Sequence, residues 1–240
     1  YVKEAAILIS SVLEKGNLVI LESTSPVGTT EKLTKWMSAE RPDLTFPENS
    51  NKKPDINIAY CPERVLPGKI LKELITNDRI IGGMTSTCSS KASSLYKIFV
   101  KADCIKTNSK TAEMAKLTEN SSRDVEIAFA NELSIICDEL DINVWELISL
   151  ANRHPRVNIL KPGPGVGGHC IAVDPWFIVS SAPENSNLIK CARKVNDFKP
   201  EYVLKKIEDE IRNFLKENLK KKIKDLKIGC FGLAFKQDID

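Results

Sequence analysis

The sequence lacks long apolar runs, a marked net charge and paired-cysteine motifs, and each absence argues against a class of protein. No stretch reaches the ~18–20 apolar residues that a membrane-spanning helix needs. A net charge of +3 is too small to indicate binding to nucleic acid or to a membrane surface. The seven cysteines are an odd number without C-x-x-C spacing. They favour reduced thiols in a cytoplasmic protein over a disulfide framework or a metal site.

What is present is an ordinary composition arranged in two patterns. With 240 residues, 42% of them hydrophobic and 28% charged, the chain can form one large domain or two modest ones. The first pattern, over residues 1–106, alternates helices and strands and predicts an α/β fold. The run "LVIL" is apolar at every position, as in a parallel sheet buried on both faces. We expect helices over 1–14, 29–39 and 88–102, and strands over 18–23, 56–61, 79–82 and 104–107.

The second pattern predicts long helices. Residues 111–141 hold no glycine or proline and keep an apolar stripe at helical spacing. Another helix is expected over 143–152. A third should run from about Ser186 towards Asn218, either continuous or broken at Pro200. The chain then ends on "LKIGCFGLAFKQDID", which begins as a buried-strand pattern.

The glycine-rich stretch 161–176, "KPGPGVGGHCIAVDPW", contains the spacing G-x-G-x-x-G. A dinucleotide-binding loop with that spacing needs a strand before it, a helix after it and an acidic residue ~20 positions on. Here prolines interrupt the approach, and Pro175 with β-forming residues follows in place of a capped helix. The glycines therefore indicate a backbone that approaches a ligand beside Cys170, with Asp174 four residues on. The alternative is a Gly-Pro loop around a buried, inert cysteine.

A lysine and an asparagine at helical spacing make the catalytic interpretation stronger. Lys116 and Asn120 stand at i,i+4 in "TAEMAKLTEN" and so share one helix face. A cation and an amide on one stripe are suited to stabilise a developing oxyanion. A surface lysine beside a polar asparagine is the structural alternative.

Two further candidates follow predicted strands. Glu63 comes directly after a buried strand in "IAYCPERVLPG", and Thr24 follows another in "LESTSPVGTT". Ligands gather at the carboxyl ends of parallel strands, so both side chains are expected at one sheet edge. Thr29 or Thr30 is expected as the N-cap of the next helix.

At this point the sequence resembles a known family. The segments "LESTSPVGTT", "CPERVLPG", "RIIGG", "TAEMAKLTEN", "GPGVGGHCIAVDPWF" and "GLAFKQDID" follow, in order, the motifs of the UDP-glucose/GDP-mannose dehydrogenases. The resemblance covers essentially all 240 residues. Within the family, "NRHPRVNIL" and "GGHCIAVDPWF" look most like the branch that oxidises UDP-N-acetylhexosamines, above all UDP-N-acetyl-D-mannosamine. His169 stands where UDP-glucose dehydrogenases more often carry a small hydroxyl residue.

The resemblance implies three regions. Residues 1–106 would be the back half of an NAD-binding, Rossmann-like parallel-sheet domain. Residues 107–224 would be a long-helix central and dimerisation domain with the catalytic cysteine loop, and 225–240 the first strand of a second, UDP-binding Rossmann-like domain. The family's amino-terminal G-x-G-x-x-G does not occur here. If these residues are the whole polypeptide, we expect an inactive core that cannot bind NAD tightly; if not, the enzyme joins two Rossmann-like domains through the helical core.

The resemblance also implies a chemistry, the four-electron oxidation of a sugar C6 alcohol with two NAD⁺ and one water, through a thiohemiacetal and a thioester on a cysteine. The catalytic residues would be Cys170 as nucleophile, Lys116 and Asn120 at the substrate oxygen, Asp174 orienting Lys116 or water, Glu63 as general base and Thr24 positioning a water. Substrate contacts would come from Arg64, Leu160, Lys161, Gly167, Lys236 and, across subunits, Arg156 with His154 nearby. Cofactor contacts would come from Ser23, Thr24 and Cys170. No metal is implied.

Several alternatives stay open. The chain could be an inactive truncated core serving as a dimerisation module, or a dehydrogenase for another UDP-sugar. A cysteine hydrolase would pair Cys170 with His154 or His169, but a histidine adjacent in sequence is poorly placed to act as its base. We expect a UDP-sugar as the partner, a homodimer or higher homo-oligomer, and a part in polysaccharide biosynthesis.

Overall fold

The computed structural model describes residues 1–47, 53–65 and 68–231. They fall into two compact units, 1–119 and 120–240. One long helix, α5 (Ser109–Glu139), begins in the first unit and ends in the second.

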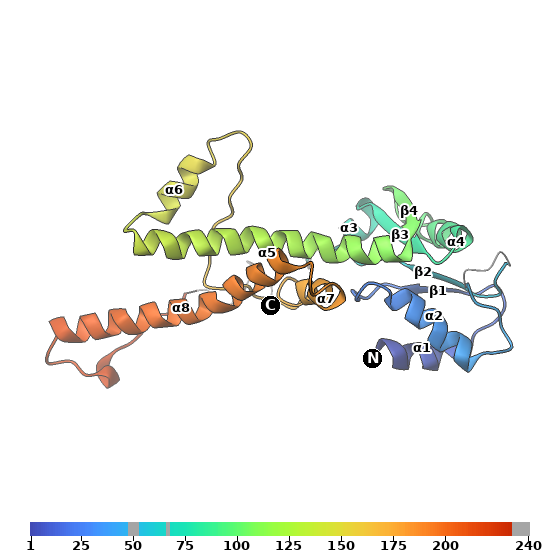
Figure 1. The fold of residues 1–240 in the computed structure, drawn as a ribbon, viewed down its shortest axis with the longest axis horizontal. Coiled ribbons are helices and arrows are strands. Elements are labelled where there is room, and N and C mark those ends of the chain that lie inside the picture. The colour runs from blue at the N-terminus through green and yellow to red at the C-terminus, as the bar shows by residue number, and fades with distance from the viewer. Residues whose placement is uncertain (48–52, 66–67, 232–240) are drawn as a thin grey trace. The chain divides into compact units, whose positions relative to one another are not determined.

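The first unit is a mixed four-stranded sheet with helices (Figure 1). The strands lie in the order β1 (Leu18–Leu21), β2 (Asn57–Tyr60), β3 (Arg79–Gly83) and β4 (Cys104–Asn108), with β1 parallel to β2 and β3 parallel to β4. The expected parallel sheet is confirmed for these two pairs, whereas at the centre β2 and β3 are antiparallel and Ala59 stands opposite Gly83. The helices are α1 (Val2–Ser10), α2 (Thr29–Glu40), α3 (Ile70–Thr76) and α4 (Ser86–Tyr96).

The connection from β2 to β3 explains the antiparallel pair. A parallel pair needs a crossover, usually a helix packed on the sheet. Among the described residues of this connection the helix is α3, which was not expected from the sequence, has seven residues and buries none of them. It therefore does not cross the sheet face, and the chain returns into β3 from the end at which it left β2.

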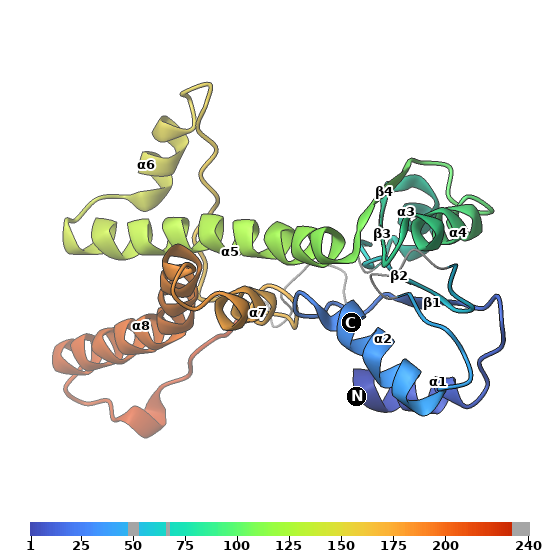
Figure 2. The ribbon, with the colours of Figure 1, turned by 45° about the vertical axis from the view of Figure 1, so that its right-hand side comes forward.

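Strand β2 forms the centre of a three-layer core. Its four residues are all buried, and successive side chains point to opposite faces. Ile58 and Tyr60 pack with residues of α1 and α2, whereas Ala59 and, just beyond the strand, Cys61 pack with α4. Figure 2 shows α1 and α2 together on one side of the sheet. Burial on both faces is the reason for the continuous apolar runs in the sequence.

The amino terminus of α2 is capped from another helix, not by its own threonines. Gly28 is the N-cap, with a left-handed φ of 89°, so the expected cap at Thr29 or Thr30 is wrong. The buried carboxylate of Glu113, on α5, accepts hydrogen bonds from the Gly28 N–H (2.6 Å), the Thr30 N–H (2.7 Å) and the Thr30 hydroxyl (2.6 Å). First-turn N–H groups have no helical partner and favour a negative charge. This contact fixes the loop before α2 to α5.

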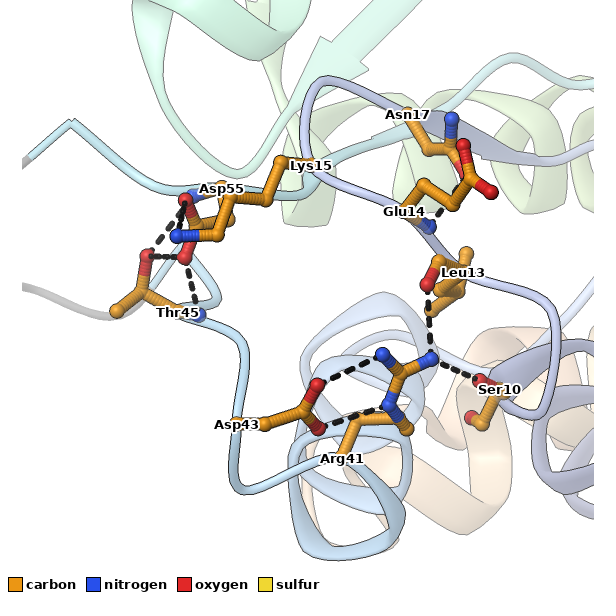
Figure 3. A network of polar contacts seen from close by, with 9 residues as sticks. All are labelled: Ser10, Leu13, Glu14, Lys15, Asn17, Arg41, Asp43, Thr45 and Asp55. Carbon is orange, nitrogen blue, oxygen red and sulfur yellow. Dashed lines mark hydrogen bonds and ion pairs between the residues drawn. The ribbon is translucent and has the colours of Figure 1, made fainter.

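Arg41, at the other end of α2, ties that helix to α1 (Figure 3). Its guanidinium donates to the carbonyl oxygens of Ser10 (3.0 Å) and Leu13 (2.8 Å) and makes two 2.8 Å hydrogen bonds to the Asp43 carboxylate. The guanidinium lowers the pKa of the Asp43 carboxyl below its ordinary value. One side chain thus satisfies carbonyl groups at the end of α1 and orients the chain that leaves α2.

In its described residues, 120–231, the second unit consists of helices: the rest of α5, α6 (Val144–Ala151), α7 (Asp174–Ser181) and α8 (Asn187–Glu217), with a 3₁₀ turn at Ile223–Asp225. Helices α5 and α8 run in the same direction, because contact partners advance together along both. The pairs are Asp124 with Arg193, Asn131 with Asn196, Ser134 with Lys199 and Asp138 with Lys206. The sequence left open whether α8 is continuous or broken at Pro200; in the structure it is continuous through Pro200.

Two expectations for this unit are wrong. Helix α7 forms where β-forming residues suggested otherwise; Asp174 and Pro175 occupy its first turn, where an acidic side chain and a proline are both favourable. Residues 226–231, the described part of the segment expected to be a strand, form none, and no described strand pairs with them. Residues 232–240 lie outside the described part. Within that part, no helix is long and apolar enough to cross a membrane.

Candidate active site

The cysteine loop is held at its carboxyl end by a polar pair. The Asn120 side-chain amide donates to the Asp174 carboxylate at 2.5 Å, and Asp174 is buried with 4% of its surface exposed. The Cys170 carbonyl accepts from the N–H groups of Val173 (3.0 Å) and Asp174 (2.9 Å), which forms the turn into α7. Gly168 has a φ of 85°, a conformation that favours glycine. A residue of α5 thus fixes the end of the loop that follows Cys170.

Cys170 itself is exposed, which removes the alternative of a buried, inert thiol. Cys191 and Cys230 are also exposed, whereas Cys61 belongs to the sheet core. Burial raises the pKa of the Cys61 thiol to about 11, so Cys61 stays protonated near neutral pH. Because the thiolate is the nucleophile, accessibility distinguishes Cys170 from the core cysteines.

The prediction that Lys116 and Asn120 share a helix face is confirmed, since both lie in α5 one turn apart. Both side chains are half-buried. Lys116 belongs to the first unit and Asn120 to the second.

The loops after β1 and β2 leave the sheet at the same edge, as the sequence predicted. The strand ladder continues past both ends, through the Cys61 N–H to the Leu21 carbonyl (3.0 Å) and the Glu63 N–H to the Glu22 carbonyl (3.4 Å). Thr24, two residues beyond Glu22, is half-buried, and Ser23 is exposed. This edge therefore carries Ser23, Thr24 and Glu63.

Glu63 has a cationic neighbour that sequence reasoning missed. Arg79 Nη1 lies 3.8 Å from Glu63 Oε1, and the Arg79 side chain is only 2% exposed. The guanidinium also donates to the Leu74 carbonyl (3.3 Å) and lies 5.6 Å from the ring centre of Tyr96. A buried arginine needs a charged partner, so Arg79 holds the carboxylate at the sheet edge. The feature of the sequence that could have indicated this contact is the arginine at the first position of the otherwise apolar strand "RIIGG".

The residues predicted to bind substrate are spread over both units. Arg64 forms an ion pair with Glu119 at 2.7 Å within the first unit. Leu160 is half-buried and Lys161 and Gly167 are exposed in the second unit, and Lys236 lies outside the described residues. His154 and Arg156 are exposed on a loop that the Asn152 side chain closes through hydrogen bonds to the N–H (2.7 Å) and carbonyl (2.9 Å) of Ile159.

The candidate residues are therefore divided between the two units. Asn120, Asp174 and Cys170 are brought together in the second, and Thr24 and Glu63 share an edge in the first. Among the described residues, no group of three or more His, Cys, Asp and Glu side chains is placed to hold a metal ion. No strand precedes the glycines over 152–162, which supports the argument against a dinucleotide loop there.

Replacing Gly165 by alanine should displace the glycine loop. A Cβ at Gly165 would lie 2.8 Å from the Pro200 Cγ, and a proline ring in a helix cannot move aside. We expect a loss of about 1–3 kcal/mol in the free energy of unfolding, measured by urea titration. Gly163→Ala is the control, because its Cβ would meet only the Gly165 carbonyl at 3.9 Å. Equal losses in both variants would contradict the packing argument.

Comparison with solved structures places the fold in a class. The UDP-D-ManNAc dehydrogenase of Pyrococcus horikoshii matches with a TM-score of 0.81 and 42% identity, over 89% of this chain and 49% of that one. The fold is that of a nucleotide-sugar dehydrogenase.

Sequence comparison narrows the class to a family. The family's NAD binding domain matches residues 1–100 and its central domain residues 110–198. The chain belongs to the UDP-glucose/GDP-mannose dehydrogenase family. It is 63% identical to the UDP-N-acetyl-D-mannosamine dehydrogenase of Escherichia coli K12 and 62% identical to the NDP-N-acetyl-D-galactosaminuronic acid dehydrogenase of Ralstonia nicotianae. All of this chain is covered in both, but only 57% and 55% of those proteins, so it spans little more than half their length.

Proposed function

We propose that this chain forms the core of an NAD-dependent dehydrogenase that oxidises the C6 alcohol of UDP-N-acetyl-D-mannosamine to the uronic acid. One observation carries the proposal: Asn120 contacts the buried Asp174, four residues after the exposed Cys170. An exposed thiol on a loop whose end is fixed by an amide and a carboxylate is suited to bind a carbonyl carbon, with the amide available to stabilise its oxygen.

Cys170 is the nucleophile in this proposal. Loss of a hydride and a proton from the alcohol leaves an aldehyde. The thiolate adds to its carbon, and the oxygen takes up a proton to give a thiohemiacetal. Loss of a second hydride and proton gives a thioester, and water then cleaves the carbon–sulfur bond, releasing the acid and the thiol.

The polar residues manage protons at the substrate oxygen. Lys116 takes up the alcohol proton and stabilises the oxyanion, and Asn120 donates to the same oxygen through the N–H that Asp174 does not use. Asp174 orients Lys116 or the hydrolytic water. Glu63 acts as general base for that water, and Thr24 positions it. The charge of Arg79 keeps the Glu63 carboxylate oriented.

NAD⁺, when bound, supplies the hydride acceptor. The loop after β1 fits this group, since Ser23 and Thr24 leave the carboxyl edge of the sheet, where such folds bind nucleotides. Cys170 is the third residue proposed to contact NAD⁺. We expect tight binding only from a polypeptide that also carries the family's G-x-G-x-x-G loop.

The nucleotide-sugar is held by residues of the loops. Lys161 and Arg64 supply cations suited to a diphosphate, with Leu160 and Gly167 beside them. Lys236 would add a further contact. The two relatives are named for derivatives of two different N-acetylhexosamines and match almost equally well, so the hexosamine class is better supported than the epimer.

Assembly as a homodimer through the second unit belongs to the same proposal. Apolar side chains remain exposed on its two long helices, among them Phe129 (52%), Ile136 (44%) and Phe198 (49%). Exposed apolar surface of this kind is typical of an interface. His154 and Arg156 would then reach the site of the neighbouring subunit. We also propose that the enzyme is cytoplasmic and takes part in polysaccharide biosynthesis.

The test is the number of NADH molecules formed per UDP-N-acetyl-D-mannosamine consumed, measured on the full-length protein. We expect two, because oxidation of an alcohol to an acid removes two hydrides. One NADH with an aldehyde product would contradict the four-electron reaction. If the protein oxidises UDP-N-acetyl-D-galactosamine or UDP-glucose instead, the proposed substrate is wrong but the dehydrogenase function stands. If folded protein forms no NADH with any UDP-sugar, the proposed function is wrong.

A further inference from the structure

The glycine loop is held at its amino end as well as its carboxyl end. The Gly163 N–H donates to the side-chain oxygen of Asn131 at 2.9 Å. Asn131 belongs to α5 and is fully buried. A buried amide side chain that accepts from a loop N–H fixes that part of the backbone, because breaking the bond would leave both groups without a partner. Gly163 lies seven residues before Cys170.

Asn131 is itself held by a buried polar network between α5 and α8. Its amide donates to the Asn196 side-chain oxygen at 2.9 Å. The Asn196 amide donates to the Asp124 carboxylate at 2.8 Å, and Arg193 donates to the same oxygen at 2.6 Å. All four side chains are at most 2% exposed. Such a network selects one orientation for the Asn131 amide, with its oxygen towards the loop.

The two ends of the loop are therefore bound to one helix face. Asn120 and Asn131 are 11 residues apart in α5, which is close to three turns at 3.6 residues each. Asn120 binds Asp174 after the cysteine and Asn131 binds Gly163 before it. The distance between the two anchors is thus set by a continuous helix.

We propose that Asn131 is a positioning residue for the reaction, and that with Asn120 it holds the Cys170 loop at a spacing fixed by α5. This inference rests on the proposed function in one respect, that Cys170 is the nucleophile. Asn131 does not touch the reacting atoms. It acts through the Gly163 backbone, so its loss should lower turnover more than substrate binding.

The test is Asn131→Ala in the full-length protein. We expect kcat to fall about 10- to 100-fold with KM within about twofold, because small displacements of a reacting group have effects of that size. Asn196→Ala, which keeps the bond to Gly163 but removes its support, should give a smaller loss. If Asn131→Ala does not fold, Asn131→Ser carries the same test.

The matched control is Ser134→Ala. Ser134 lies three residues further along α5, where its hydroxyl accepts from the amine of the buried Lys199 on α8 and donates to the backbone carbonyl of Asn131 (2.6 Å). Its loss therefore loosens the same helix pair without touching the Asn131 side chain or the loop. We expect a comparable fall in thermal stability but a normal kcat. An equal loss of kcat in Ser134→Ala, or a normal kcat in folded Asn131→Ala, overturns the inference.

A second readout needs no substrate. The rate at which iodoacetamide modifies Cys170, relative to the exposed Cys191, is followed by peptide mass spectrometry in each variant. We expect this ratio to change by about threefold or more in Asn131→Ala and to stay constant in Ser134→Ala, since thiol reactivity depends on its surroundings. An unchanged ratio in Asn131→Ala contradicts the positioning role. Because this measurement stands without turnover, it separates a wrong inference about Asn131 from a wrong proposed function.

Discussion

Replacing Cys170 by serine should lower the rate of acid formation by roughly 10³-fold or more, the range seen when a catalytic nucleophile is removed. A serine hydroxyl is not ionised at neutral pH and is a weak nucleophile, whereas a cysteine can react as its thiolate. The serine variant therefore captures the intermediate aldehyde poorly. Product acid and NADH are both measured from UDP-N-acetyl-D-mannosamine. The NADH yield should fall from two per sugar towards one, or to none if the first step also needs the thiol.

The chain offers a close control for this substitution. Cys191→Ser changes another exposed thiol, on α8, outside the glycine loop, and should leave the rate within about twofold of the parent, as surface changes commonly do. Acid formation at the parent's rate in Cys170→Ser would mean that water attacks the aldehyde directly. The thiohemiacetal and thioester would then leave the mechanism, although the dehydrogenase function would stand.

The parts of this molecule that follow from local sequence could be predicted. Apolar runs indicated β1, β2 and β3, and the i,i+4 spacing placed Lys116 and Asn120 on one face, because a helix fixes that geometry whatever surrounds it. The shared edge of Thr24 and Glu63 followed from the parallel pairing of β1 with β2. These features depend on residues close together or on one strand pair.

The parts that depend on distant residues could not be predicted. Glu113 caps α2 across 83 residues, and Asn131 binds Gly163 across 32. A buried glutamate and a buried asparagine have no pattern of their own, because their partners are set by tertiary packing. The antiparallel centre of the sheet was missed for the same reason, since it depends on where α3 lies. Residues that support the site are thus harder to find in a sequence than residues that react.

Replacing Arg193 by methionine should remove about 3–5 kcal/mol from the free energy of unfolding, the usual effect of breaking a buried ion pair. Arg193 and Asp124 are 2% and 0% exposed and lie 2.6 Å apart, so the variant leaves a buried carboxylate without its cation. A loss of this size is a large share of the ~5–15 kcal/mol that stabilises a typical domain. Urea unfolding followed by circular dichroism measures it.

Arg212→Met is the matched control, on the same helix. Arg212 pairs with Glu208 at 3.3 Å, but both side chains are more than 60% exposed, so the change should cost no more than about 1 kcal/mol. Combining Arg193→Met with Asp124→Asn should recover part of the loss, because the unpaired charge is then gone. Equal losses in the two arginine variants would mean that the buried pair is not the source.

The loss in Arg193→Met should also depend on pH, with a definite sign. Burial raises the pKa of Asp124 above its ordinary value of 3.8, although the Asn196 hydrogen bond and the Arg193 charge act in the opposite direction. A carboxyl whose pKa is raised by folding binds its proton more tightly in the folded state. Its stabilising contribution is therefore present below pH 3.8 and is lost as the pH rises through the raised value. Without Arg193 the pKa should rise further, so the loss should be smaller at pH ~5 than at pH ~7. A loss that is the same at both values would show that Asp124 is not left as an unpaired charge.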